Sequence, residues 1–236
     1  MRNIIETLLE RSDLQVSNNA VVIKRPCEIL ISANVVNKIK DIYAPTFERG
    51  GLLLLQPTPT RGQLFGKDLV VIPNQSAANS AYEPNEFIFK AEIAKAINAG
   101  FLPVAIHTHP TKLGLSGYDN KRVNFYLSSS QPDQRIAAAG VDIAGRKLLL
   151  PEAIAVVDTR FDTGFSIAFY EGGILPASLA ALSKTELAVA GAAGVSLLVW
   201  QRPLLLLLAV VFLYSEYRRP KYTPQNDGGL LVEFRK

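Results

Sequence analysis

The sequence is poor in several residue types, and each shortage argues against a class of protein. Among its 236 residues there is a single cysteine, Cys27. An intramolecular disulfide framework is therefore excluded, and a reducing compartment is favoured. Because Cys27 lies in an apolar, strand-like stretch, we expect it to be buried rather than reactive. Long basic runs are also missing, since the net charge is only +4 and lysines and arginines are scattered apart from a cluster at 218–221. We therefore expect no nucleic-acid binding.

Two further signals are missing from the chain. The glycine pairs at 50–51 and 172–173 lack the spacing and the following helix of a phosphate-binding loop. The N-terminus lacks the long apolar core of a signal peptide. We therefore expect neither a nucleotide-phosphate loop nor a secretory signal.

Hydrophobic periodicity predicts strands that alternate with helices. Apolar residues recur at helical spacing in 33–43 and 86–98. Residues 50–56 contain four successive leucines, which is typical of a strand buried on both faces. Further strands are predicted at 20–24, 28–32, 68–73, 101–107, 147–150, 153–158 and 165–170, and short helices at the N-terminus and at 119–128. The predicted class is α/β (α+β), with helices that flank one mixed sheet.

The two histidines of the chain, His107 and His109, lie together in Ile-His-Thr-His-Pro. On a strand, residues i and i+2 point to the same face, so both imidazoles can bind one metal ion. Asp119, ten residues after His109, can add a carboxylate oxygen. Three protein ligands and one water are typical of a catalytic zinc site, which lowers the pKa of the water toward neutrality.

A zinc-bound water also needs a base and a partner for the oxyanion. Glu48, just before the buried leucine strand, can take the proton of the water and pass it to a leaving amine. Ser116 can donate a hydrogen bond to the oxyanion or orient the site. Ser116 can equally be a helix N-cap, because a carboxylate, Asp119, lies three residues further on.

These motifs together resemble the JAMM motif of the Jab/MPN domain family of zinc metalloproteases. The resemblance consists of a glutamate before a Gly-Leu-Leu strand, then His-Thr-His-Pro, then Ser-x-x-Asp, and it covers roughly residues 20–175. It includes Asn74 after the second strand and a helix that leads into the His-x-His strand. One difference is that one residue fewer than usual separates His109 from Ser116.

The resemblance implies an activity and a role for each motif residue. Members of the family hold one zinc ion and cleave isopeptide or peptide bonds after the Gly-Gly tail of ubiquitin and ubiquitin-like proteins, and some bacterial members act on sulfur-carrier relatives. By resemblance, the zinc ligands are His107, His109 and Asp119, the catalytic acid/base is Glu48, and the serine that stabilises the tetrahedral intermediate is Ser116. Two alternatives remain open, namely a non-catalytic MPN-like membrane scaffold and a zinc peptidase that acts on small peptide conjugates.

The longest apolar stretch of the chain is Leu187 to Tyr214. A capping-box pattern at 183–186 predicts a helix that begins near Lys184. Gln201-Arg202-Pro203 divides the stretch, and neither part reaches the ~20 residues that a membrane span needs. Three interpretations remain open: a helical hairpin with its turn at 201–203, a single long span, and two buried helices in a soluble core or homodimer.

The predicted organisation places an N-terminal helix and extension at 1–19, a Jab/MPN domain at 20–176, a linker at 177–186, a membrane-associated segment at 187–217 and a basic tail at 218–236. Because positively charged flanks stay on the cytoplasmic side, we expect a membrane-associated protein whose catalytic domain faces the cytoplasm.

Overall fold

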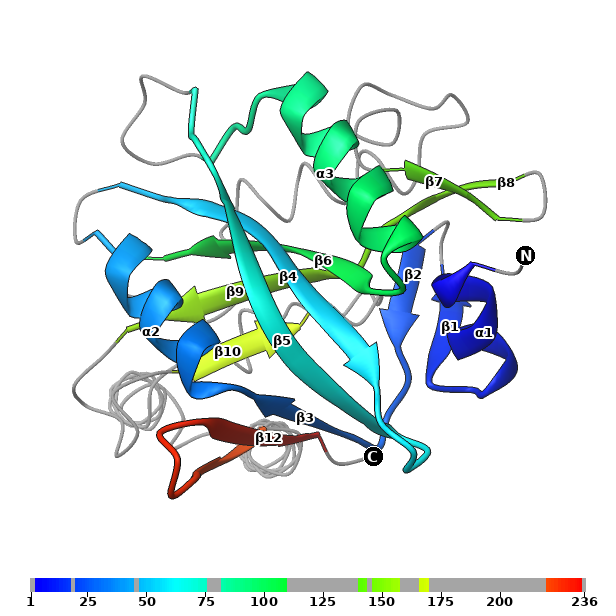
Figure 1. The fold of residues 1–236 in the computed structure, drawn as a ribbon, viewed down its shortest axis with the longest axis horizontal. Helices are drawn as coiled ribbons and strands as arrows, with labels where there is room; N and C mark the ends of the chain where they lie inside the picture. Colours follow the sequence, from blue (N-terminus) through cyan, green and yellow to red (C-terminus); the bar gives the residue numbers. More distant parts are fainter. Residues whose placement is uncertain are drawn as a thin grey trace, which may run out of the picture.

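The computed structural model describes residues 3–17, 20–44, 47–75, 82–109, 140–143, 146–157, 166–169 and 220–234. The helices in these ranges are α1 (Ile4–Glu10), α2 (Ala33–Ile42) and α3 (Glu86–Asn98). The strands are β1 (Leu14–Ser17), β2 (Ala20–Ile23), β3 (Cys27–Ile31), β4 (Gly50–Pro57), β5 (Gln63–Ile72), β6 (Leu102–Thr108), β7 (Gly140–Ile143), β8 (Arg146–Leu149), β9 (Glu152–Val156), β10 (Ser166–Phe169), β11 (Lys221–Pro224) and β12 (Leu230–Phe234). The predicted mixed α/β class is confirmed (Figure 1).

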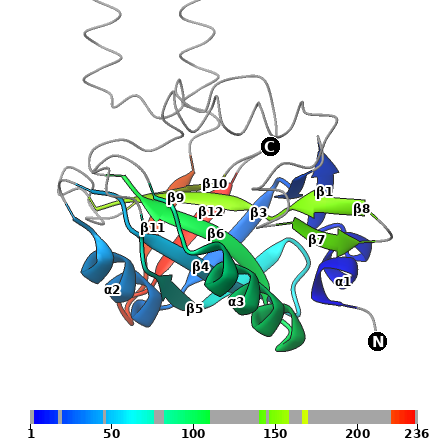
Figure 2. The ribbon, with the colours of Figure 1, turned by 90° about the horizontal axis from the view of Figure 1, so that it is seen from above.

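Among the described residues the strands form two sheets rather than the single sheet that the sequence predicts. The larger sheet has eight strands in the order β10-β9-β6-β4-β5-β3-β12-β11, and the smaller has four in the order β1-β2-β8-β7. In the larger sheet, β4 is antiparallel to both of its neighbours, β5 and β6, and β6 is parallel to β9. Helices α2 and α3 lie on the same face of this sheet (Figure 2).

The helices begin and end where the sequence provides capping residues. Ser32 caps α2 by accepting a hydrogen bond from the backbone of Val35, and Asn85 caps α3 in the same way from Ile88. Gly100, which follows α3, has a φ of +80°, in the left-handed region that glycine adopts after a helix. The predicted helices at 33–43 and 86–98 are therefore confirmed.

The leucines of β4 explain why this strand lies at the centre of the sheet. Leu52, Leu53, Leu54 and Leu55 are all buried, so both faces of the strand are covered. Burying each leucine side chain stabilises the fold by roughly 1.5–3 kcal/mol, so the run favours a place for this strand in the middle of the core. The prediction of a strand buried on both faces is confirmed.

Within the basic tail predicted at 218–236, the structure describes two strands that the sequence does not predict. Residues 221–224 and 230–234 form the hairpin β11–β12, and β12 pairs antiparallel with β3. Leu230, Val232 and Phe234 are buried at every second position, which is the period of a strand with one face against the core. Basic residues before the hairpin and Gly228-Gly229 within its turn conceal this short alternation in the sequence.

The two edges of the larger sheet approach each other. The Tyr222 hydroxyl of β11 donates a hydrogen bond of 2.9 Å to the Ile167 carbonyl of β10. The rings of Phe169 and Phe234 meet edge to face, with their centroids 5.4 Å apart. The sheet is therefore curled, and its two edge strands, β10 and β11, lie close together.

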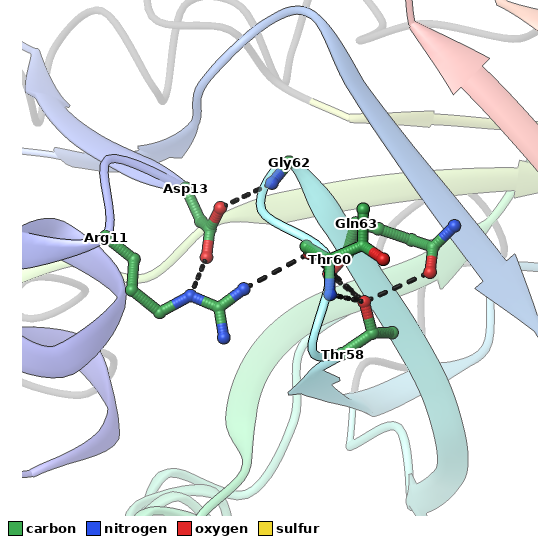
Figure 3. A network of polar contacts seen from close by, with 6 residues as sticks. All are labelled: Arg11, Asp13, Thr58, Thr60, Gly62 and Gln63. Carbon is green, nitrogen blue, oxygen red and sulfur yellow. Dashed lines mark hydrogen bonds and ion pairs between the residues drawn. The ribbon is translucent and has the colours of Figure 1, made fainter.

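A buried carboxylate joins the N-terminal residues to the β4–β5 turn (Figure 3). Asp13 accepts a 2.7 Å hydrogen bond from the Gly62 N–H and forms a 2.7 Å ion pair with Arg11. Arg11 also donates to the Thr60 carbonyl. The N-terminal helix is thus anchored to the turn between the two long strands of the sheet.

No helix within the described ranges is long and apolar enough to cross a membrane. The predicted linker at 177–186 and the predicted membrane-associated segment at 187–217 lie outside the described residues.

Candidate metal centre

The pairing of β4 with β6 brings a carboxylate to the two histidines. Gly50 of β4 lies opposite His107 of β6 in an antiparallel ladder. Glu48, two residues before Gly50, is therefore opposite His109, two residues after His107. Because side chains two positions apart share a face, Glu48, His107 and His109 all point to one face of the sheet.

The distances within this group suit the coordination of a metal ion. The Nε2 atoms of His107 and His109 are 2.9 Å apart, and His109 Nε2 is 3.5 Å from Glu48 Oε1. One potential ligand atom from each of the three residues lies within 4.8 Å of the others. Ligand atoms at about 2.0–2.1 Å from a tetrahedral zinc are about 3.3 Å apart. The three side chains could therefore hold a metal ion with little rearrangement.

All three side chains are buried. The residues Glu48, His107 and His109 are only 8%, 5% and 4% exposed. A carboxylate and two imidazoles withdrawn from water are unfavourable unless they are paired or bind a metal. Both the burial and the donor types of the group fit a metal site.

Tyr82 fixes the orientation of the Glu48 carboxylate. Its backbone N–H donates a 3.1 Å hydrogen bond to Glu48 Oε2, while Oε1 of the same carboxylate faces His109. The Tyr82 ring lies nearly parallel to the His107 ring, at 13° and 6.4 Å between centroids. Burial raises the pKa of the Tyr82 phenol, so its hydroxyl stays protonated and donates to the Ile72 carbonyl. Tyr82 thus links Glu48, His107 and the end of β5.

Asn74 holds the main chain of Glu48. Its side-chain N–H donates a 3.1 Å hydrogen bond to the Glu48 carbonyl, and its Oδ1 accepts one from the Glu83 N–H. The asparagine that the JAMM resemblance includes therefore contacts the residue expected to be the base. Glu48 is held through both its backbone and its side chain.

Thr108, which lies between the two histidines, forms hydrogen bonds with the backbone of Arg49, the residue after Glu48. It is 1% exposed, and its N–H donates a 2.7 Å hydrogen bond to the Arg49 carbonyl. Its hydroxyl is also within hydrogen-bond distance of the Arg49 carbonyl and N–H. The next residue, His109, donates its N–H to the Ala155 carbonyl of β9 at 2.9 Å. These bonds fix the backbone on both sides of the metal-binding face.

Gly50 is required by the close approach of the two strands. A Cβ at this position would lie 2.2 Å from the Ile106 carbonyl oxygen and 2.9 Å from the His107 Cα. Both contacts are with backbone, which cannot move aside as a flexible side chain could. The first glycine of the Gly-Gly-Leu-Leu motif is therefore explained by the position of His107.

The structure brings together three of the five predicted site residues. Glu48, His107 and His109 form one group, whereas Ser116 and Asp119 lie outside the described residues and stay predictions. The sequence assigns Glu48 as a base beside the metal, and its carboxylate also lies close enough to His109 to serve as a ligand. Tyr82 has no role in the sequence prediction, because it belongs to a polar loop whose position depends on the fold.

Comparison of the chain with protein-family models and with curated protein sequences gives no match.

The geometry at Gly50 gives a first prediction. Gly50→Ala should lower the free energy of unfolding by about 1–3 kcal/mol, as overpacked substitutions do, because the added Cβ collides with the β6 backbone. It should also weaken any metal binding by this group, because the backbone of His107 must move. Gly66→Ala in β5 is the matched control, since its Cβ would meet only ordinary contacts of 3.5 Å or more.

Urea unfolding and zinc titration of the two variants test this prediction. If Gly50→Ala binds zinc as tightly as Gly66→Ala and unfolds at the same urea concentration, the claim that strand proximity sets the His107 position is wrong.

Proposed function

We propose that this protein is a zinc-dependent hydrolase of the JAMM type. The observation that carries the proposal is the buried group of Glu48, His107 and His109, which two strands assemble from distant parts of the sequence. These are the residue types, in the order, that the JAMM resemblance requires. The mixed α/β fold, with a helix that leads into the His-x-His strand, is also the architecture that the resemblance implies.

Each residue has a defined task in this proposal. The zinc ligands are His107, His109 and, from the sequence, Asp119. When bound, the zinc lowers the pKa of a water ligand and polarises the scissile carbonyl. Glu48 Oε1 would accept a proton from the attacking water and deliver it to the departing amine nitrogen. Ser116 donates a hydrogen bond to the oxyanion, as the resemblance implies.

The hydrogen bond from Tyr82 matters for the proton transfer. Because Oε2 of Glu48 accepts from the Tyr82 N–H, the carboxylate keeps Oε1 directed toward the histidines. A carboxylate oxygen that is already held in position does not have to be oriented at each proton transfer, which lowers the entropic cost of the step. The three side chains are buried, so bulk solvent has little access to them.

The proposed substrate class is a ubiquitin-like or sulfur-carrier protein, cleaved after its C-terminal tail. This class comes from the resemblance, and the alternatives make different predictions. A non-catalytic MPN-like scaffold would have no zinc-dependent hydrolysis. A peptidase for small conjugates would cleave short peptides as well as it cleaves a folded ubiquitin-like protein.

Glu48→Gln tests the proposed catalytic role. The amide keeps the size of the side chain but cannot take a proton, so hydrolysis should fall by about 10²–10⁴-fold while one zinc per chain remains bound. Glu86→Gln, which changes an exposed carboxylate on α3, is the control and should keep wild-type activity. Activity would be followed on a ubiquitin-like fusion, and zinc by metal analysis.

Unchanged hydrolysis in Glu48→Gln would contradict the assigned role. Loss of zinc together with hydrolysis would assign Glu48 to the ligands instead of the base.

We further propose that residues 187–217 associate with a membrane as a helical hairpin, with the catalytic domain on the cytoplasmic side. The support is the apolar sequence together with its two flanks. β10 precedes the segment, β11 follows it, and the hydrogen bond between Tyr222 and Ile167 joins these strands. A single crossing would place the two strands on opposite sides of the membrane, whereas a hairpin keeps them together.

Cysteine labelling in lipid vesicles tests this topology. Asn98→Cys on α3 and Asn226→Cys in the β11–β12 turn are exposed positions on either side of the segment in sequence. Burial raises the pKa of Cys27 to about 12, so the native thiol should not react with a membrane-impermeant maleimide at neutral pH. We expect full-chain protein to float with the vesicles and both introduced cysteines to be labelled to the same extent.

Opposite labelling of the two positions would support a single span. A chain that stays soluble and does not float would support the buried helix pair.

A further inference from the structure

The second ring nitrogen of His107 faces a carboxylate. His107 Nε2 lies beside His109 Nε2, whereas Nδ1 on the other side of the ring is 3.9 Å from Glu152 Oε1. The side chains of His107 and Glu152 are only 6% and 12% exposed. The imidazole therefore lies between the metal-binding face and a largely buried acidic group.

The sheet itself determines this arrangement. Glu152 is the first residue of β9, which runs parallel to β6 with Glu152 opposite Ala105. Ala105 is two positions before His107, so Glu152 and His107 belong to the same face of the sheet. The Ala105 N–H donates to the Pro151 carbonyl, which fixes the start of β9 against β6. Glu152 is thus placed by strand register, as Glu48 is on the other side of β6.

The chemistry of imidazole gives the contact a consequence. A neutral ring carries its proton on one nitrogen and offers the lone pair of the other. A carboxylate near Nδ1 favours the tautomer with the proton on Nδ1, which leaves the Nε2 lone pair for a metal. At 3.9 Å the contact is longer than a hydrogen bond, so it acts through the charge of the carboxylate in a region of little water.

We propose that Glu152 is a positioning residue for the metal centre, whose carboxylate selects the Nδ1–H tautomer of His107 and so presents Nε2 to zinc. The proposal rests on the proposed zinc site and adds a fourth side chain to the described group. Glu152 would act through His107 rather than as a metal ligand or a substrate contact. Its contribution is to the affinity and the orientation of one ligand.

The sequence contains no local signal for this role. A lone glutamate at the beginning of a strand is usually a solvated residue, and Glu152 is far from His107 along the chain. Only the parallel pairing of β6 with β9 places the two together.

Zinc affinity of the full chain is the first test. Glu152→Gln has the same shape without the charge, and Glu152→Leu also removes the hydrogen-bonding groups. We expect the zinc dissociation constant to rise about 10–100-fold, the usual effect of losing such a partner. The leucine variant should bind zinc more weakly than the glutamine variant. Glu152→Asp keeps the charge and should recover part of the affinity. Glu92→Gln on α3, where the carboxylate pairs with Lys95, is the matched control.

The tautomer of His107 is the second test, and a merely structural role would not change it. Because the chain has two histidines, ¹⁵N-labelling gives only four ring-nitrogen signals, which His109→Asn assigns. In metal-free wild-type protein the proton of His107 should lie on Nδ1. In Glu152→Leu, or in Glu152→Gln if the leucine variant does not fold, it should move toward Nε2.

Weaker zinc binding together with the tautomer shift supports the proposal. Affinity within about threefold of wild type, or weaker affinity without a tautomer shift, overturns the role of Glu152 but leaves the zinc hydrolase intact. Wild-type protein that binds no zinc overturns both this inference and the proposed function, so the two failures are distinguishable.

Discussion

The antiparallel register of β4 and β6 is the constraint on which the candidate site depends. Gly50 opposite His107 places Glu48 opposite His109, and a shift of one residue would turn one of the two sets of side chains to the other face. The approach of the strands at this point is close enough to require a glycine. The buried leucines that follow in β4 hold the strand in the core. Burial of these leucines therefore also fixes the strand that carries Gly50 beside His107.

Neighbouring elements then restrict each functional group separately. Tyr82 and Asn74 hold the side chain and the carbonyl of Glu48, Thr108 fastens the backbone at Arg49, and Glu152 faces the far side of the His107 ring. Such support from surrounding residues is what a metal site needs in order to present its ligands in one arrangement. In the same sheet, a hydrogen bond joins β10 and β11, the strands before and after the apolar segment in sequence. This contact is the structural support for the proposed hairpin topology.

Local sequence patterns predicted much of this structure, and long-range pairings account for what they missed. The His-x-His pair at the end of a strand, the four-leucine strand and both capped helices depend on neighbouring residues, and they are confirmed. The contacts of Tyr82 and Glu152 depend on which strands pair, which no local period reveals. The strand predicted at 68–73 begins earlier, at Gln63, because its first half pairs with β3 and β4 after a turn rich in proline and threonine. The β11–β12 hairpin was missed because its alternation is short and follows basic residues. Ser116 and Asp119 remain predictions from the motif.

X-ray absorption combined with metal analysis of the full chain is the most direct test of the proposal that His107 and His109 bind one catalytic zinc ion. We expect one zinc per chain, bound by nitrogen and oxygen ligands at about 2.0–2.2 Å with the scattering pattern of two imidazoles, and loss of that zinc in His109→Ala. A chain that binds no stoichiometric zinc, or a His109→Ala variant that retains it with the same spectrum, would show that the proposed zinc site is wrong.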